Sequence, residues 1–96
     1  MDAHELLKKH RREILQAAAR HGAQNVRVFG SVARGEADSL SDIDFLVELE
    51  PGRTLMDHAA LQLDLQEILN CKVDVVSDRG IKPRIRERVL REAVAL

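Results

Sequence analysis

Three aspartates are the residues of this sequence best suited to do chemistry. Asp42 and Asp44 stand one residue apart at the start of an apolar run, and Asp74 lies within a later apolar run. Successive side chains of a strand point to opposite faces, so Asp42 and Asp44 project from the same face. If the run that contains Asp74 forms the neighbouring strand, the three carboxylates converge at one end of a sheet.

Three carboxylates held close together repel one another unless a cation lies between them. Oxygen ligands without histidine or thiolate suit a hard ion, above all Mg²⁺, which completes its shell with waters and substrate phosphates. Two such ions about 4 Å apart form the clamp for in-line phosphoryl or nucleotidyl transfer. Asp74 is also a candidate to accept the proton of an attacking hydroxyl. The pattern alone leaves open that Asp42 caps a turn and that Asp44 is an exposed strand residue.

A candidate phosphate-binding segment precedes the aspartates. Gly30 ends an apolar run and permits close approach of a ligand to the backbone, and Ser31 supplies a hydroxyl where a helical turn begins. Backbone N–H groups at such a turn bind anions, and Arg34 lies one turn further on. A glycine–serine pair alone is typical of ordinary turns. Together with the aspartates, it predicts a phosphate site opposite a metal site.

The apolar pattern also predicts the elements that must position these residues. Their order is α-β-(short α)-β-α-β-α, an α/β sandwich on a small, mixed, three-stranded sheet flanked by helices. The expected helices cover residues 2–21, 54–69 and 83–94, with a short helical turn at 31–36. The expected strands cover residues 25–30, 43–49 and 72–77, with a polar loop at 37–41. The core-facing positions expected on the second and third strands are Ile43, Phe45, Val47, Leu49, Val73 and Val75.

Composition limits the class of protein. The 96 residues suffice for one domain with its own core, and the single cysteine, Cys71, excludes an internal disulfide framework. No apolar run approaches membrane-spanning length, so no membrane partner is expected and the cytoplasm is the expected location. With only two aromatic residues, stacking surfaces for single-stranded nucleic acid are nearly absent, and direct binding of nucleic acid is not expected.

Charge is unevenly distributed along the chain, although the net charge is −1. Residues 36–57 contain seven acidic residues and one basic residue, and residues 79–92 contain six basic residues and two acidic ones. Such a distribution suits a metal-and-polyanion site, but it is also typical of two solvated faces. The basic segment leaves three options open: RNA binding, packing on the sheet through Ile85, Val89 and Ala93, or docking of an acidic partner.

The segment GSVARGEADSLSDIDFLV, followed by Asp74 in a later strand, resembles the signature of the polymerase-β-type nucleotidyltransferase superfamily. In so short a chain it is similar to the minimal nucleotidyltransferase (MNT) proteins. The resemblance runs from the strand at Val26 to the strand at Asp74, and it implies a single nucleotidyltransferase domain over residues 1–96. It further implies that Gly30 and Ser31 hold the triphosphate of ATP. Asp42 and Asp44 would then bind two Mg²⁺ ions, and Asp74 would serve the catalytic ion and the attacking hydroxyl.

The same resemblance implies a biological role. MNT proteins are typically antitoxins that transfer AMP from ATP to a tyrosine of a cognate HEPN-domain ribonuclease toxin and thereby silence it. A second hypothesis is an antitoxin that only occludes its toxin, but occlusion does not need three carboxylates placed together. A third is nucleotidyl transfer to a small molecule or an RNA 3′ end, which the missing second domain disfavours.

Overall fold

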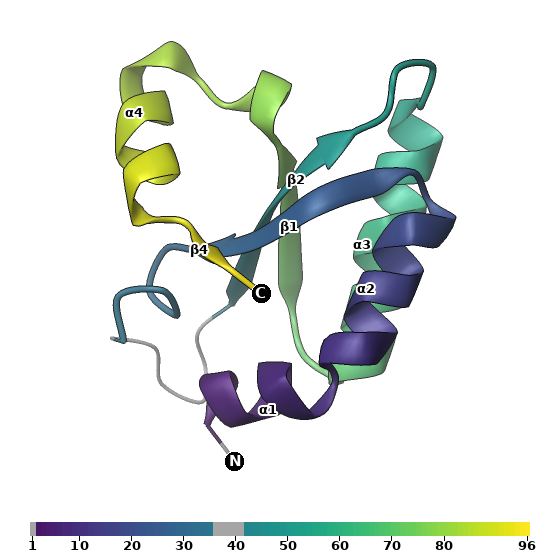
Figure 1. Ribbon diagram of the computed structural model, residues 1–96, viewed down its shortest axis with the longest axis vertical. Helices are drawn as coiled ribbons and strands as arrows, with labels where there is room; N and C mark the ends of the chain where they lie inside the picture. Colours follow the sequence, from purple (N-terminus) through teal and green to yellow (C-terminus); the bar gives the residue numbers. More distant parts are fainter. Residues whose placement is uncertain (1, 36–41) are drawn as a thin grey trace.

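The computed structural model describes residues 2–35 and 42–96. In these residues, α2 and α3 cover one face of a sheet and α4 lies over the other (Figure 1). The elements, in chain order, are α1 (Ala3–Lys9), α2 (Arg11–Arg20), β1 (Ala23–Phe29), β2 (Ile43–Leu49), α3 (Leu55–Leu69), β3 (Val73–Ser77), a 3-10 turn η1 (Asp78–Gly80), α4 (Pro83–Glu92) and β4 (Val94–Ala95).

The sheet has four strands in the order β3-β2-β1-β4. Strand β2 pairs parallel with β3 and antiparallel with β1, so the predicted mixed sheet is confirmed. The predicted number of three strands is wrong, because the chain leaves α4 at Ala93 and adds β4 antiparallel to β1. A strand of two residues has no readable alternation of apolar side chains, so the pattern extended the preceding helix to residue 94 instead.

The single helix expected over residues 2–21 is also wrong. It is divided at His10, whose backbone leaves helical geometry with φ −103° and ψ 12°. Leu7 of α1 and Ile14 of α2 both reach the main core from the two sides of this break. No glycine or proline marks the break in the sequence, so propensity favoured one continuous helix.

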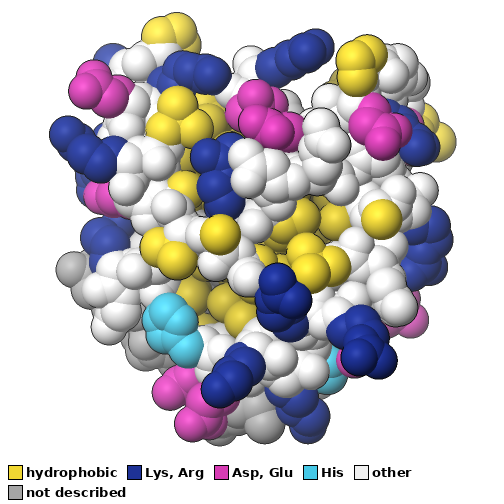
Figure 2. Space-filling view, viewed as in Figure 1, with side chains coloured by type: hydrophobic (Ala, Val, Ile, Leu, Met, Phe, Trp, Pro, Cys, Tyr) yellow, Lys and Arg dark blue, Asp and Glu magenta, His cyan; other side chains and the backbone are white. Residues whose placement is uncertain are grey.

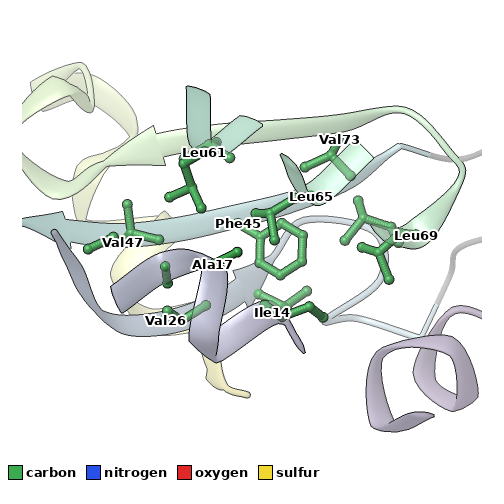
Figure 3. Packing of buried hydrophobic residues seen from close by; sticks show 14 of the residues in the cluster. Ile14, Ala17, Val26, Phe45, Val47, Leu61, Leu65, Leu69 and Val73 are labelled. Carbon is green, nitrogen blue, oxygen red and sulfur yellow. The ribbon is translucent and has the colours of Figure 1, made fainter. Parts of the chain in front are cut away.

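The main core lies between the sheet and helices α2 and α3. Figure 3 shows Phe45 of β2 among Ile14, Leu65 and Leu69, and these four side chains are at most 3% exposed. The expected inward positions of β2 and β3 are confirmed: Ile43, Phe45, Val47, Val73 and Val75 are buried, and Leu49 packs against the same core. This packing fixes which side chains β2 and β3 present to the other face.

Helix α3 begins with a capping box. The Thr54 side chain accepts a hydrogen bond from the helix backbone, and the Asp57 carboxylate accepts one from the Thr54 N–H. Its buried positions are Leu61, Leu65 and Leu69, whereas three other large apolar side chains of the helix are exposed: Leu55, Met56 and Leu63. At 15 residues α3 is the longest helix described, and none in residues 2–35 and 42–96 is long and apolar enough to cross a membrane.

A second, smaller core fills the space between the sheet and α4. Leu46 of β2, Ile81 and Val89 are buried there, with Phe29 and Val76 packed against them. The predicted packing of α4 on the sheet is confirmed for Val89, and Ala93 is partly buried in the same cluster, but Ile85 is 45% exposed. The sequence pattern missed this core because Leu46 stands between two inward-facing residues of β2.

Candidate functional site

Asp44 and Asp74 lie side by side on the sheet. They are direct partners in the parallel β2–β3 ladder, and both project from the face opposite the main core. Their apolar neighbours along the strands point the other way and are buried. The predicted adjacency of the strands that carry these two aspartates is therefore confirmed.

Asp42 lies just before β2, at the same end of the sheet. Its Oδ2 is 3.5 Å from Nζ of Lys72, which lies just before β3. The two segments are joined at this point because Ile43 donates a backbone hydrogen bond to the Lys72 carbonyl over 3.2 Å. Lys72 was not predicted as part of the site, although its position two residues before Asp74 sets it level with Asp42.

Gly30 lies directly against the Asp44 carboxylate. Its φ of +76° is a conformation that favours glycine, and a Cβ built at this position would lie 2.4 Å from Asp44 Oδ2. Phe29, the preceding residue, is the antiparallel partner of Asp44. The predicted phosphate segment and the predicted carboxylate site are thus in contact.

The chain after Gly30 forms a tight turn. Arg34 N–H donates to the Gly30 carbonyl and Gly35 N–H donates to the Val32 carbonyl, both over 3.1 Å. Val32 is buried in the main core and anchors the turn, while Ser31 is half-buried. The expected helical turn at 31–36 is therefore seen as hydrogen-bonded turn geometry over residues 31–35. Residue 36 and the loop expected at 37–41 lie outside the described residues.

Arg34 is tied to α4. Its Nη1 donates to Oε2 of Glu92 over 3.2 Å, and Arg88 Nε donates to the other carboxylate oxygen of Glu92 over 3.2 Å. The hydrogen bond from Arg88 and that from Arg34 lower the pKa of Glu92. No motif in the sequence distinguishes Glu92 from the other charges of the helix, so this contact was not predicted.

Negative charge is concentrated at Asp44. Partial burial raises the pKa of its carboxyl above the ordinary value of 3.8, Asp74 and Asp42 raise it further, and Arg34 opposes them. In residues 2–35 and 42–96, no three Asp, Glu, His or Cys side chains are arranged as a complete ligand set for one ion. Mg²⁺ commonly takes only one or two protein carboxylates and leaves its other positions to water and phosphate. The donor set and the excess negative charge therefore fit a hard cation.

Replacing Asp44 by asparagine is expected to stabilise the protein at about pH 7 without divalent cations, because the folded state then no longer holds this disfavoured charge. A raised folded-state pKa means that the charge costs stability above that pKa and nothing below 3.8. The advantage of Asp44→Asn should therefore shrink as the pH falls toward about 4. Urea unfolding at several pH values measures it.

Added Mg²⁺ should raise the unfolding free energy of the parent chain and have little effect on Asp44→Asn. Glu48→Gln, on the same strand, is the matched control and should keep the Mg²⁺ response. Equal stabilisation of the parent and Asp44→Asn by Mg²⁺ would contradict a cation site at Asp44.

The fold and these residues define a class of protein. The family model of the nucleotidyltransferase domain matches residues 7–96, nearly the whole chain. The chain belongs to this family, and it is an enzyme of the nucleotidyltransferase class.

Its relatives narrow the class. The chain is 37% identical over 89 residues to the protein adenylyltransferase MntA of Thermococcus cleftensis, covering 93% of this chain and 87% of that protein. It is 40% identical over 84 residues to MJ0435 of Methanocaldococcus jannaschii, also named a protein adenylyltransferase, covering 88% and 90%. The resemblance to minimal nucleotidyltransferases is confirmed.

Solved structures agree with this assignment. A structure described as a minimal nucleotidyltransferase superposes with a TM-score of 0.87 at 59% identity, covering 96% of this chain and 94% of the other. A toxin–antitoxin structure with AMP-PNP superposes with a TM-score of 0.75 at 22% identity, covering 88% and 69%. At that identity the second likeness shows the fold alone.

Proposed function

We propose that this protein is the antitoxin of a toxin–antitoxin pair and that it transfers AMP from ATP to a tyrosine hydroxyl of its toxin, an HEPN-domain ribonuclease. The observation that carries the proposal is the contact between Gly30 and the Asp44 carboxylate, with Asp74 directly beside Asp44 in the ladder. A turn without a Cβ against paired carboxylates leaves room for a phosphate beside a bound cation, which suits in-line nucleotidyl transfer.

Each candidate residue has a role in this proposal. Gly30, Ser31 and Arg34 hold the triphosphate, through the backbone of the turn, the hydroxyl and the guanidinium. Asp42 and Asp44 would hold two Mg²⁺ ions, and Asp74 would contribute a carboxylate oxygen to the catalytic ion. When bound, the ions neutralise phosphate charge and lower the pKa of the attacking hydroxyl.

The chemical step is an in-line displacement at the α-phosphorus. The tyrosine oxygen forms the new bond to phosphorus, the bond from phosphorus to the oxygen that bridges to the β-phosphate breaks, and pyrophosphate leaves. Asp74 accepts the phenolic proton. The product is a phosphodiester between AMP and the tyrosine.

A protein acceptor is favoured over a small one by two observations. Relatives at 37% and 40% identity are named protein adenylyltransferases. In addition, three large apolar side chains of α3, Leu55, Met56 and Leu63, are 83%, 80% and 64% exposed, which is typical of a surface that contacts another protein.

The described residues of the face shown in Figure 2 offer no continuous basic surface for RNA. Basic side chains on the face shown in Figure 2 are spread out, with acidic side chains among them, rather than gathered into one patch. Binding along a phosphate backbone favours a continuous basic surface.

The test uses the full chain, ATP, Mg²⁺ and the purified product of the gene beside its own. Intact-mass spectrometry should show the mass of one or more AMP groups added to that product, and peptide sequencing should place them on tyrosine. The RNA-cleaving activity of the modified product should be lost and should return when the AMP is removed enzymatically. Addition of AMP to RNA or to a small molecule in its place would overturn the proposed acceptor.

Omitting ATP distinguishes the alternative hypothesis, an antitoxin that only occludes its toxin, from AMP transfer. If the chain silences its partner equally well without ATP, and no mass is gained when ATP is present, occlusion is the function.

A further inference from the structure

An open apolar cavity of about 280 Å³ lies between the sheet and α4. Phe29 of β1 and Val76 of β3 line it from the sheet, and Ile81, Ile85 and Val89 line it from the segment that returns over the sheet. Lys82 is the charged residue of the lining, and Gly80 completes it. Figure 1 shows α4 over this face of the sheet, away from α2 and α3.

The cavity shares its face of the sheet with the carboxylates. Phe29 is the ladder partner of Asp44, and directly paired side chains lie about 5 Å apart on the same face. Val76 stands two residues after Asp74, so it lies roughly 7 Å further along the same face. The carboxylates and the apolar cavity are therefore adjacent parts of one surface.

We infer that this cavity receives the nucleobase of the nucleotide, and that it favours a purine. The inference rests on the proposed nucleotidyl transfer. A nucleotide with its phosphates at Gly30 and the aspartates carries its base one ribose away, which matches the step from Asp44 and Asp74 to the cavity.

The lining suits a flat ring. The chain has two aromatic residues, of which Phe45 is fully buried in the main core, whereas Phe29 is only partly buried and lines the cavity. A base stacked on an aromatic ring and packed against isoleucine and valine gains contact in proportion to its area, so a purine gains more than a pyrimidine. Apolar contacts distinguish adenine from guanine only weakly.

Helix α4 forms the outer wall of the cavity and is held to the phosphate turn by the Arg34–Glu92 ion pair. The turn contacts Asp44 through Gly30, and Asp44 is paired with Phe29. The same few contacts thus position the wall of the base site relative to the phosphate site.

The test measures binding by the chain alone, with calorimetry and three ligands, ATP, CTP and inorganic tripolyphosphate, each with Mg²⁺. Ile85→Asp places a carboxylate at the cavity and should weaken ATP binding about tenfold, while tripolyphosphate binding changes little. Ile85 is 45% exposed, so the variant should fold. Phe29→Leu keeps the site apolar without the ring and should also weaken the binding of ATP but not that of tripolyphosphate.

The preference for a purine is tested with CTP. The parent protein should bind ATP several-fold more tightly than CTP, and Ile85→Asp should lose this preference.

Leu63→Asp is the matched control, since it introduces the same carboxylate at an exposed apolar position of α3. It should leave the binding of ATP and of tripolyphosphate unchanged. Unchanged ATP affinity in Ile85→Asp and Phe29→Leu would overturn the inference. An equal loss of affinity for ATP and for tripolyphosphate would overturn it as well.

The binding measurements do not depend on which molecule accepts the AMP, so the base site and the proposed function can fail separately. If ATP binds as described and the partner gains no AMP, the proposed function fails and the base site stands. If the partner is modified by Ile85→Asp with unchanged ATP affinity, the base site fails and the proposed function stands.

Discussion

Asp44→Asn is expected to lower the rate of AMP transfer by at least about 10³-fold, the equivalent of roughly 4 kcal/mol of transition-state stabilisation. Asparagine fills the same space but carries no charge, so it cannot draw a cation to the junction between the Gly30 turn and Asp74. Asp42→Asn should have a similar effect, because its carboxylate lies at the same end of β2. The measurement is the initial rate at which a tyrosine-containing partner gains AMP mass.

Folding does not account for such a loss, since Asp44→Asn is expected to be more stable than the parent in the absence of Mg²⁺. Glu48→Gln removes a carboxylate from the far half of β2 and should keep the parent rate. A transfer rate for Asp44→Asn within about tenfold of the parent would place the reacting phosphate elsewhere. Silencing of the proposed toxin partner by Asp44→Asn without mass gain would indicate occlusion.

Gly30→Ala should reduce transfer about 100-fold, because small displacements of reacting groups carry penalties of this size. The new Cβ would be 2.4 Å from Asp44 Oδ2, so the carboxylate or the turn must move. The φ of +76° adds a backbone cost of roughly 1–2 kcal/mol for any residue with a Cβ.

Gly35→Ala separates these two effects. Gly35 has a similar φ of +74°, but a Cβ there meets nothing within 4 Å. In urea unfolding Gly35→Ala should lose the backbone cost alone and Gly30→Ala at least as much, whereas only Gly30→Ala should lose transfer activity. Equal loss of activity in the two variants would mean that turn conformation matters and contact with Asp44 does not.

The positions of the site residues could be predicted because each depends on a short-range rule. Alternation along a strand sets Asp44 and Asp74 opposite the buried valines and phenylalanine, and a glycine at a strand end signals close approach. The contacts of Lys72 and Glu92 were not predicted, because they join segments that are distant in the sequence. Lys72 meets Asp42, and Glu92 meets Arg34, only after the sheet and α4 are assembled.

For the fold too, the elements with local sequence signals were predicted and those that depend on long-range packing were not. Strand β2 was expected at 43–49 and is found there, because its apolar period and the Pro51–Gly52 stop are local signals. The break at His10 and the strand at Val94–Ala95 are decided by packing that no local pattern records. The burial of Leu46 is of the same kind, since a residue between Phe45 and Val47 is buried only because α4 covers the second face.

Helix α4 rests on the sheet through a small core, in which Val89 is its one buried residue, while α2 and α3 share the larger core. Segments with few buried contacts open in local fluctuations that cost less free energy than global unfolding. Amide hydrogens of α4 are therefore expected to exchange with solvent by a local opening that leaves β2 and β3 intact. A nucleotide whose base lies beneath α4 would oppose this opening in proportion to its binding free energy, and α4 would then couple nucleotide occupancy to the local stability of one short segment.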